Sequence, residues 1–169
     1  MNLDTIKIKV NDYHQNGQTI TALYWLIKKF NLQTKNLKGF EFREAAKPDF
    51  ILMTTEGHFD APQIIRIPEN TFEFPLELML CLLAHEMVHV HQKTIKPFVL
   101  DKNEREWQAY YEMLFHKTFP SLPQISNSST RFFGNKALQY YNQMGANSPL
   151  QQKYLSQKLE MDNLLNSIP

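Results

Sequence analysis

The stretch PLELMLCLLAHEMVHVHQK, residues 75–93, decides how this chain folds. Apolar side chains occupy nearly every position from Leu76 to Ala84, so they cover all sides of a helix rather than one stripe. Pro75 suits the first position of a helix, and Pro97 marks the region where that helix has ended. The sequence therefore predicts a buried helix over residues 75–93, in the middle of the fold.

The polar end of this helix carries three of the six histidines of the chain. His85 and His89 are four residues apart, which places both on one face of a helix, where two imidazole nitrogens can bind one metal ion. Glu86 lies about 100° round the helix axis, within reach of a water molecule on that metal. Residues 85–89 form the HExxH pattern, in which Zn²⁺ acidifies its water and the glutamate acts as general base. The alternative is a partly exposed polar turn, but these three groups need partners if they are buried.

A catalytic zinc usually takes three protein ligands and leaves the fourth position to water. Gln92 and Ile95 stand where a metzincin would have Gly and His, so that class is excluded. His91 faces away from the ligand side of the helix, and we interpret it as a surface histidine or a hydrogen-bond donor behind the ligands. The third ligand must therefore come from another part of the chain.

The segment NEREWQAYYEM, residues 103–113, supplies the best candidate. Together with HExxH it resembles the gluzincin-type metallopeptidases, including the small minigluzincins, in which a second helix carries a ligand glutamate followed three positions later by a small residue. The resemblance covers about residues 80–113. It implies that Glu106 is the third ligand and that Ala109 lets the two helices approach closely. Glu106, Ala109 and Met113 also share one face of the predicted helix.

Two other interpretations of this segment stay open. Asn103 and Glu106 have the spacing of an N-cap residue and its reciprocating glutamate, so Glu106 can be a capping residue. Glu104 is then the ligand, and Trp107 takes the place of the small residue. A ligand elsewhere in the chain is the remaining alternative, as with His58 or His116.

Upstream of the buried helix, the pattern predicts a helix and a small sheet. Residues 20–30 show the apolar stripe of an amphipathic helix, whereas residues 5–10, TIKIKV, alternate as a short strand does. Further segments rich in β-branched and aromatic residues predict strands, in FEFREA (40–45), DFILMTT (49–55) and PQIIRIP (62–68). Small zincins commonly bind substrate along the sheet edge, and by that resemblance Pro62–Ile67 is the candidate edge. The alternative is a core strand.

A helix and short sheet before HExxH also resemble, more distantly, the SprT-like metalloprotease domains. The third ligand of that family is usually a histidine a few positions before an aromatic residue. Around Trp107 this chain offers only Asn103, Glu104 and Glu106. This departure weakens the assignment and, with it, any DNA-linked role.

Downstream, the sequence predicts mainly helices. Residues 104–117 form the predicted glutamate helix, and residues 121–130 a loop of turn-forming residues. Two helical segments follow, at 133–144 and 149–166, and the near-helical spacing of apolar residues in the second indicates core packing more than a lid. Hydrolysis also needs a donor for the oxyanion. Its candidates are Tyr110, Tyr111, Arg131 and Tyr140.

Composition indicates the class of protein. With 169 residues and 43% hydrophobic side chains, residues 1–169 fit one globular domain. A formal charge of +1 gives no general attraction to nucleic acid or to an anionic membrane, and no stretch has the length of a membrane span. Cys81 stands alone in an apolar run, which indicates a buried side chain. We expect a cytoplasmic protein, with export left open because a signal removed beforehand would be invisible.

These observations predict a single α+β domain of the zincin-like kind, with an N-terminal helix and small mixed sheet before the HExxH helix, then a glutamate helix and C-terminal helices. The expected function is zinc-dependent hydrolysis of a peptide bond in a protein or peptide substrate. His85, His89 and Glu106 are the expected Zn²⁺ ligands and Glu86 the general base. The alternatives are a zincin-like binding module that cleaves nothing and a zinc hydrolase of a non-peptide amide. The sequence leaves the oligomeric state open.

Overall fold

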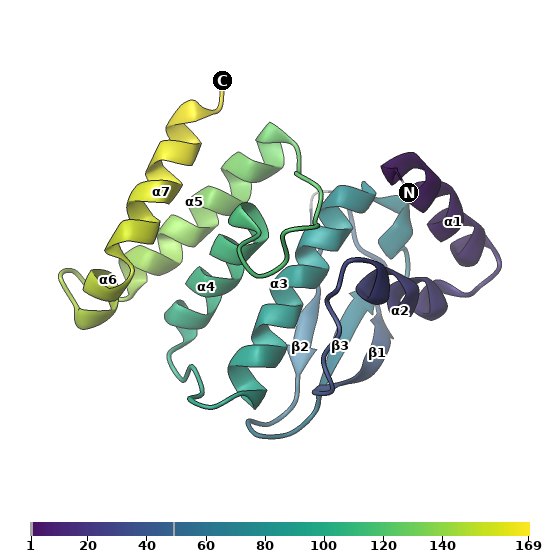
Figure 1. The fold of residues 1–169 in the computed structure, drawn as a ribbon, viewed down its shortest axis with the longest axis horizontal. Helices are drawn as coiled ribbons and strands as arrows, with labels where there is room; N and C mark the ends of the chain where they lie inside the picture. Colours follow the sequence, from purple (N-terminus) through teal and green to yellow (C-terminus); the bar gives the residue numbers. More distant parts are fainter. Residues whose placement is uncertain (1, 49) are drawn as a thin grey trace.

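The computed structural model describes residues 2–48 and 50–169, and within them it contains seven α-helices and one three-stranded sheet (Figure 1). The predicted α+β class is confirmed. The elements, in chain order, are α1 (Leu3–Gln15), α2 (Thr19–Lys29), β1 (Leu37–Arg43), β2 (Thr54–Glu56), β3 (Gln63–Pro68), the short 3₁₀ helix η1 (Thr71–Glu73), α3 (Leu76–Thr94), α4 (Lys102–Phe115), α5 (Asn127–Gln143), α6 (Pro149–Lys153) and α7 (Leu155–Ser167).

The first segment is a helix, so the predicted strand over residues 5–10 is wrong. The Asn2 side chain caps α1 by accepting a hydrogen bond from the backbone N–H of Thr5. Ile6 and Val10, four residues apart, are buried, whereas Ile8 is 71% exposed. The apparent alternation of three apolar residues therefore hides a helical stripe, in which only the first and the last face the core.

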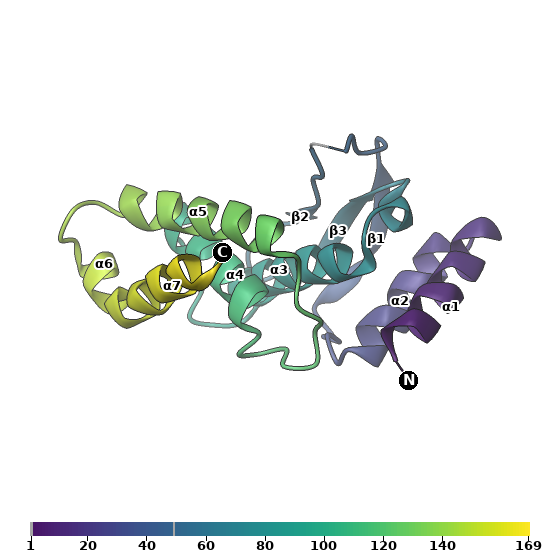
Figure 2. The same cartoon turned by 90° about the horizontal axis from the view of Figure 1, so that it is seen from above.

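The sheet has the order β1-β3-β2, in which β1 runs parallel to β3 and β2 runs antiparallel to it. β3 is thus the central strand, so the prediction that Pro62–Ile67 form the edge is wrong and the core-strand alternative holds. The sheet is covered by helices on one face (Figure 2). Ile65 and Ile67 are fully buried, whereas Arg66 points to the other face and pairs there with Glu41 and Glu56. The edge on the side of α3 belongs to β2.

Helix α3 is the buried central helix that the sequence predicts. It runs through the middle of the molecule in Figure 1, with the strands on one side and α4 on the other. Its residues Leu80, Cys81, Leu83, Ala84 and Met87 are at most 1% exposed. They join side chains of α1, α2 and β3 in the larger of two hydrophobic clusters.

A second cluster holds the C-terminal helices. Trp107 and Tyr111 of α4 pack there against Tyr141 of α5, Tyr154, and Met161 of α7, which is fully buried. This confirms the core-packing interpretation of the last segment. Helix α5 begins at Asn127, six residues before its predicted start, because Ser126 caps it by accepting from the N–H of Ser129. The last four residues of the predicted loop, 127–130, therefore belong to the helix.

Candidate metal centre

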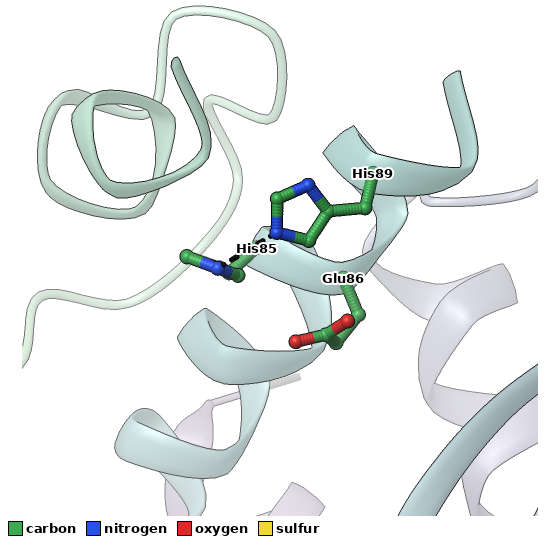
Figure 3. Close-up of side chains that lie close together, drawn as sticks. All are labelled: His85, Glu86 and His89. Carbon is green, nitrogen blue, oxygen red and sulfur yellow. Dashed lines mark hydrogen bonds between the residues drawn. The ribbon is translucent and has the colours of Figure 1, made fainter. Parts of the chain in front are cut away.

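His85 and His89 come from successive turns of α3, and their side chains converge (Figure 3). The two Nε2 atoms are 3.1 Å apart, and the residues are only 5% and 8% exposed. In the absence of a cation, a neutral pair can form one N–H···N hydrogen bond across this contact, with one imidazole donating and the other accepting. The apposed nitrogens are suited to a shared cation.

Glu106, in the second turn of α4, brings its carboxylate to the same point. Its Oε2 lies 3.6 Å from His85 Nε2, and its Oε1 lies 3.7 Å from His89 Nε2. Burial opposes ionisation of Glu106, but the neighbouring His85, the charges of both histidines and that of Lys102 together lower its pKa. The predicted proximity of the glutamate helix to the HExxH helix is therefore observed.

The rival assignments for Glu104 and Asn103 do not match the structure. Asp101 is the N-cap residue of α4, accepting from the N–H of Glu104, so the predicted cap at Asn103 is wrong. The Asn103 side chain donates instead to the backbone oxygen of Gln143. The Glu104 carboxylate accepts from Lys153 and Tyr154, on the side of α4 that faces the C-terminal helices.

The other histidines lie away from this point. His58 is exposed in the connection between β2 and β3. His116 is buried at the end of α4, where its ring contacts the backbone oxygen of Met113 and the Cys81 sulfur. His91 is half-buried and its ring lies 6.3 Å from that of Phe119.

The arrangement fits a tetrahedral metal. Nitrogens at about 2.0–2.1 Å from one zinc ion are about 3.3 Å apart, close to the observed 3.1 Å between the two Nε2 atoms. Ligand atoms of His85, Glu86 and His89 all lie within 4.8 Å of one another, so this buried group can hold a metal ion. The two oxygens of Glu106 also face the two Nε2 atoms, whereas one oxygen of Glu86 accepts a hydrogen bond from Thr55.

The Glu86 side chain, 6% exposed, lies beside the histidine pair rather than between the rings (Figure 3). Its Oε2 accepts a 2.8 Å hydrogen bond from the Thr55 hydroxyl of β2. Lys93, two turns further along α3, donates to the Thr55 backbone oxygen at 2.8 Å. The edge strand therefore holds the carboxylate that the sequence predicts as the general base.

Behind His89 lies Gln92, which no sequence pattern assigned to the site. Its Oε1 is 2.8 Å from His89 Nδ1, and its amide nitrogen donates to the backbone oxygen of Arg105 and to Gln108. Burial, and then the charge of His85, lower the pKa of His89, which favours the neutral imidazole that a metal requires. Only the one-turn spacing from His89 to Gln92 could have indicated this contact in advance. His85 Nδ1, in contrast, is buried with no hydrogen-bond partner among the described residues.

His85, Glu86 and His89 line a cleft of about 690 Å³. One wall is formed by β2 and the residues before it, and the opposite wall by α4 and α5. The lining includes the apolar residues Phe50, Ile51, Leu52, Met53, Leu78, Leu82, Phe132 and Phe133. Residues of α6 and α7 are not among those lining the cleft in the part of the chain that is described.

Two of the four candidate oxyanion donors lie in this cleft, Tyr110 and Tyr140. The Tyr110 ring packs edge-on against His85 at 4.4 Å and stacks on Tyr140 at 5.9 Å. Burial and the charge of Glu106 raise the pKa of both phenols, so they remain hydrogen-bond donors at neutral pH. Tyr111 instead contacts Glu160, and Arg131 binds the last backbone oxygens of the chain.

Comparisons of the chain with protein-family models, with curated proteins and with solved structures give no match. In the described residues, no helix has the length and apolar character needed to cross a membrane. The interpretation of the site therefore rests on its geometry.

Proposed function

We propose that this protein is a zinc-dependent peptidase. The observation that carries the proposal is the convergence of His85, His89 and Glu106 at one point, with the Glu86 carboxylate beside them at the base of a cleft. A structural zinc site is closed by four protein ligands and needs no free carboxylate next to it. The resemblance to gluzincins points to the same ligands.

When bound, zinc would lower the pKa of a water molecule and polarise the scissile carbonyl. Glu86 accepts the proton as the water oxygen attacks the carbonyl carbon, and it then passes that proton to the amine nitrogen as the C–N bond breaks. Thr55 keeps the carboxylate oriented through its hydroxyl. Tyr110 and Tyr140 line the cleft and are the candidate donors for the oxyanion.

The substrate that fits the cleft best is an extended peptide segment with apolar side chains. β2 is an edge strand, and a peptide can add to such an edge through main-chain hydrogen bonds. Exposed apolar side chains gather on the same cleft, since Phe50 is 63%, Phe132 56% and Leu52 37% exposed. Such clusters on a protein surface mark binding sites for apolar groups.

The experiment compares metal content and hydrolysis in matched variants. We expect about one zinc per chain in the wild type by elemental analysis, lost in His89→Ala and Glu106→Ala. His58→Ala is the control, because that exposed histidine lies outside the cleft, and it should keep the metal. Glu86→Gln should keep zinc but lose peptide hydrolysis by roughly 10²–10⁴-fold, the usual contribution of a general base.

Two results would contradict the proposal. A folded wild type that takes up no zinc, even after incubation with the ion, would leave a binding module as the better explanation. Hydrolysis that persists in Glu86→Gln would remove this carboxylate from the chemistry.

A further inference from the structure

We propose that a relay of four buried or half-buried side chains, Gln92, Gln108, Tyr154 and Glu104, holds the proton of His89 on Nδ1 and thereby keeps Nε2 free to bind metal. These are positioning residues, because they act through His89. The inference rests on the metal site proposed above. By this inference the junction between α6 and α7, which is far in sequence from the metal ligands, has a role in the metal centre.

The relay is continuous from α3 to the C-terminal helices. His89 Nδ1 lies 2.8 Å from Gln92 Oε1, and Gln92 Nε2 donates to Gln108 Oε1 at 2.9 Å. Gln108 Nε2 then donates to the Tyr154 hydroxyl. That hydroxyl donates to Glu104 Oε1 at 2.6 Å, and Lys153 donates to the same oxygen at 2.7 Å.

The Glu104 carboxylate, at one end of the relay, determines which group donates in each hydrogen bond. Glu104 accepts from Tyr154, so the single hydroxyl hydrogen of Tyr154 is used and its oxygen must accept from Gln108. With its nitrogen turned to Tyr154, Gln108 presents its oxygen to Gln92. Gln92 therefore donates to Gln108 and presents its own oxygen to His89.

A second contact determines the orientation of Gln92 independently. Its Nε2 also donates to the backbone oxygen of Arg105 at 3.0 Å, an atom that can only accept. The Gln92 oxygen must then face His89, which can meet it only by donating from Nδ1. In a neutral imidazole the lone pair is then on Nε2, the atom that faces His85 and Glu106.

No comparable relay lies behind His85 in the described residues. Its Nδ1 has no hydrogen-bond partner among the described residues, so no side chain orients this ring from behind. The metal centre is therefore asymmetric, with one histidine oriented from behind. Residues behind metal ligands commonly change metal affinity by about 10–100-fold when they are mutated.

A purely structural network that joins α4 to the C-terminal helices is the competing explanation, and a matched pair of variants separates the two. Tyr154→Phe removes the hydroxyl in the relay. Tyr141→Phe removes a hydroxyl that donates to the backbone oxygen of Gln151, in the same hydrophobic cluster but outside the relay. Both rings contact Trp107 and both residues are buried, so the cost in packing is comparable.

The first readout is the tautomer of His89 in the metal-free protein, from long-range ¹H–¹⁵N spectra at alkaline pH. We expect hydrogen on Nδ1 in the wild type and in Tyr141→Phe, and a mixture of tautomers in Gln92→Leu. The second readout is zinc affinity by competition with a chelator. We expect a loss of about 10–100-fold in Gln92→Leu and a smaller, several-fold loss in Tyr154→Phe, with Tyr141→Phe unchanged.

Hydrogen on Nε2 of His89 in the wild type would overturn the relay, as would equal losses of zinc affinity in Tyr154→Phe and Tyr141→Phe. The tautomer measurement needs neither zinc nor hydrolysis. A chain that binds zinc but cleaves nothing would thus refute the peptidase and leave the relay standing.

Discussion

The carboxylate of Glu86 accepts a hydrogen bond from the Thr55 hydroxyl, which also lies 3.0 Å from the Glu86 backbone oxygen. Thr55→Val keeps the shape of the side chain and removes this donor. A hydrogen bond to a charged group contributes about 1.5–3 kcal/mol, so we expect kcat for peptide hydrolysis to fall about ten- to hundredfold. Zinc content should not change, because Thr55 contacts no histidine of the site in the described hydrogen bonds.

Thr71→Val is the matched control for this variant. The hydroxyl of Thr71 is fully buried and donates to the backbone oxygen of Pro68, away from the cleft. It should lower the free energy of unfolding without changing kcat. Equal losses of activity in the two variants would mean that Thr55 acts only through stability.

The residues of the site differ in how far the sequence indicates them. His85, Glu86 and His89 could be predicted because one helix determines their relative positions. The contact between Thr55 and Glu86 joins residues 31 positions apart, and that between Gln108 and Tyr154 joins residues 46 apart. Such contacts depend on how the elements pack, so no local pattern contains them.

Helix α4 must lie close to α3 for Glu106 to reach the histidines, and we expect the small side chain of Ala109 to permit this approach. Ala109 is fully buried, one turn after Glu106, on the same side as the core residue Met113. Ala109→Leu should lower the free energy of unfolding by about 1–3 kcal/mol through overpacking. It should also weaken zinc binding, because α4 would carry Glu106 away from α3.

Ala137→Leu tests whether that loss is specific. Ala137 is equally buried, but it lies on α5 in the second hydrophobic cluster. For Ala137→Leu we expect a similar loss in the free energy of unfolding, measured by urea titration, and an unchanged zinc affinity. Retention of zinc affinity in Ala109→Leu as well would show that the spacing of the two helices does not control the site.

At the level of elements, the sequence predicts strongly periodic segments well and short ones poorly. The helix predicted over residues 75–93 is observed as Leu76–Thr94. This prediction succeeds because the apolar run is long enough to indicate a helix. The alternation over residues 5–10 is too short to separate a strand from a helix that exposes Ile8. The place of β3 at the centre of the sheet follows from pairing with β1 and β2, which its own residues do not encode.

In the whole molecule, α4 joins the two hydrophobic clusters. Met113 packs in the cluster of α3 and the sheet, whereas Trp107 and Tyr111 pack with α5 and α7. Tyr110 and Phe133 contact both clusters. The cleft lies where the two meet, so its walls come from both halves of the structure. Packing at this junction therefore positions Glu106 relative to the HExxH pair.

A metal at this junction should stabilise the folded chain as a whole, because its ligands tie α3 to α4 and are separated in the unfolded state. Zinc at 100 times its dissociation constant would add about 2.7 kcal/mol to the free energy of unfolding. For a chain of this size that corresponds to a rise in Tm of about 5–11 °C. Calorimetry with zinc and then with excess chelator measures the shift. In Glu106→Ala we expect most of it to be lost, since only the α3 ligands remain; a full shift in that variant would mean that the metal is held by α3 without α4.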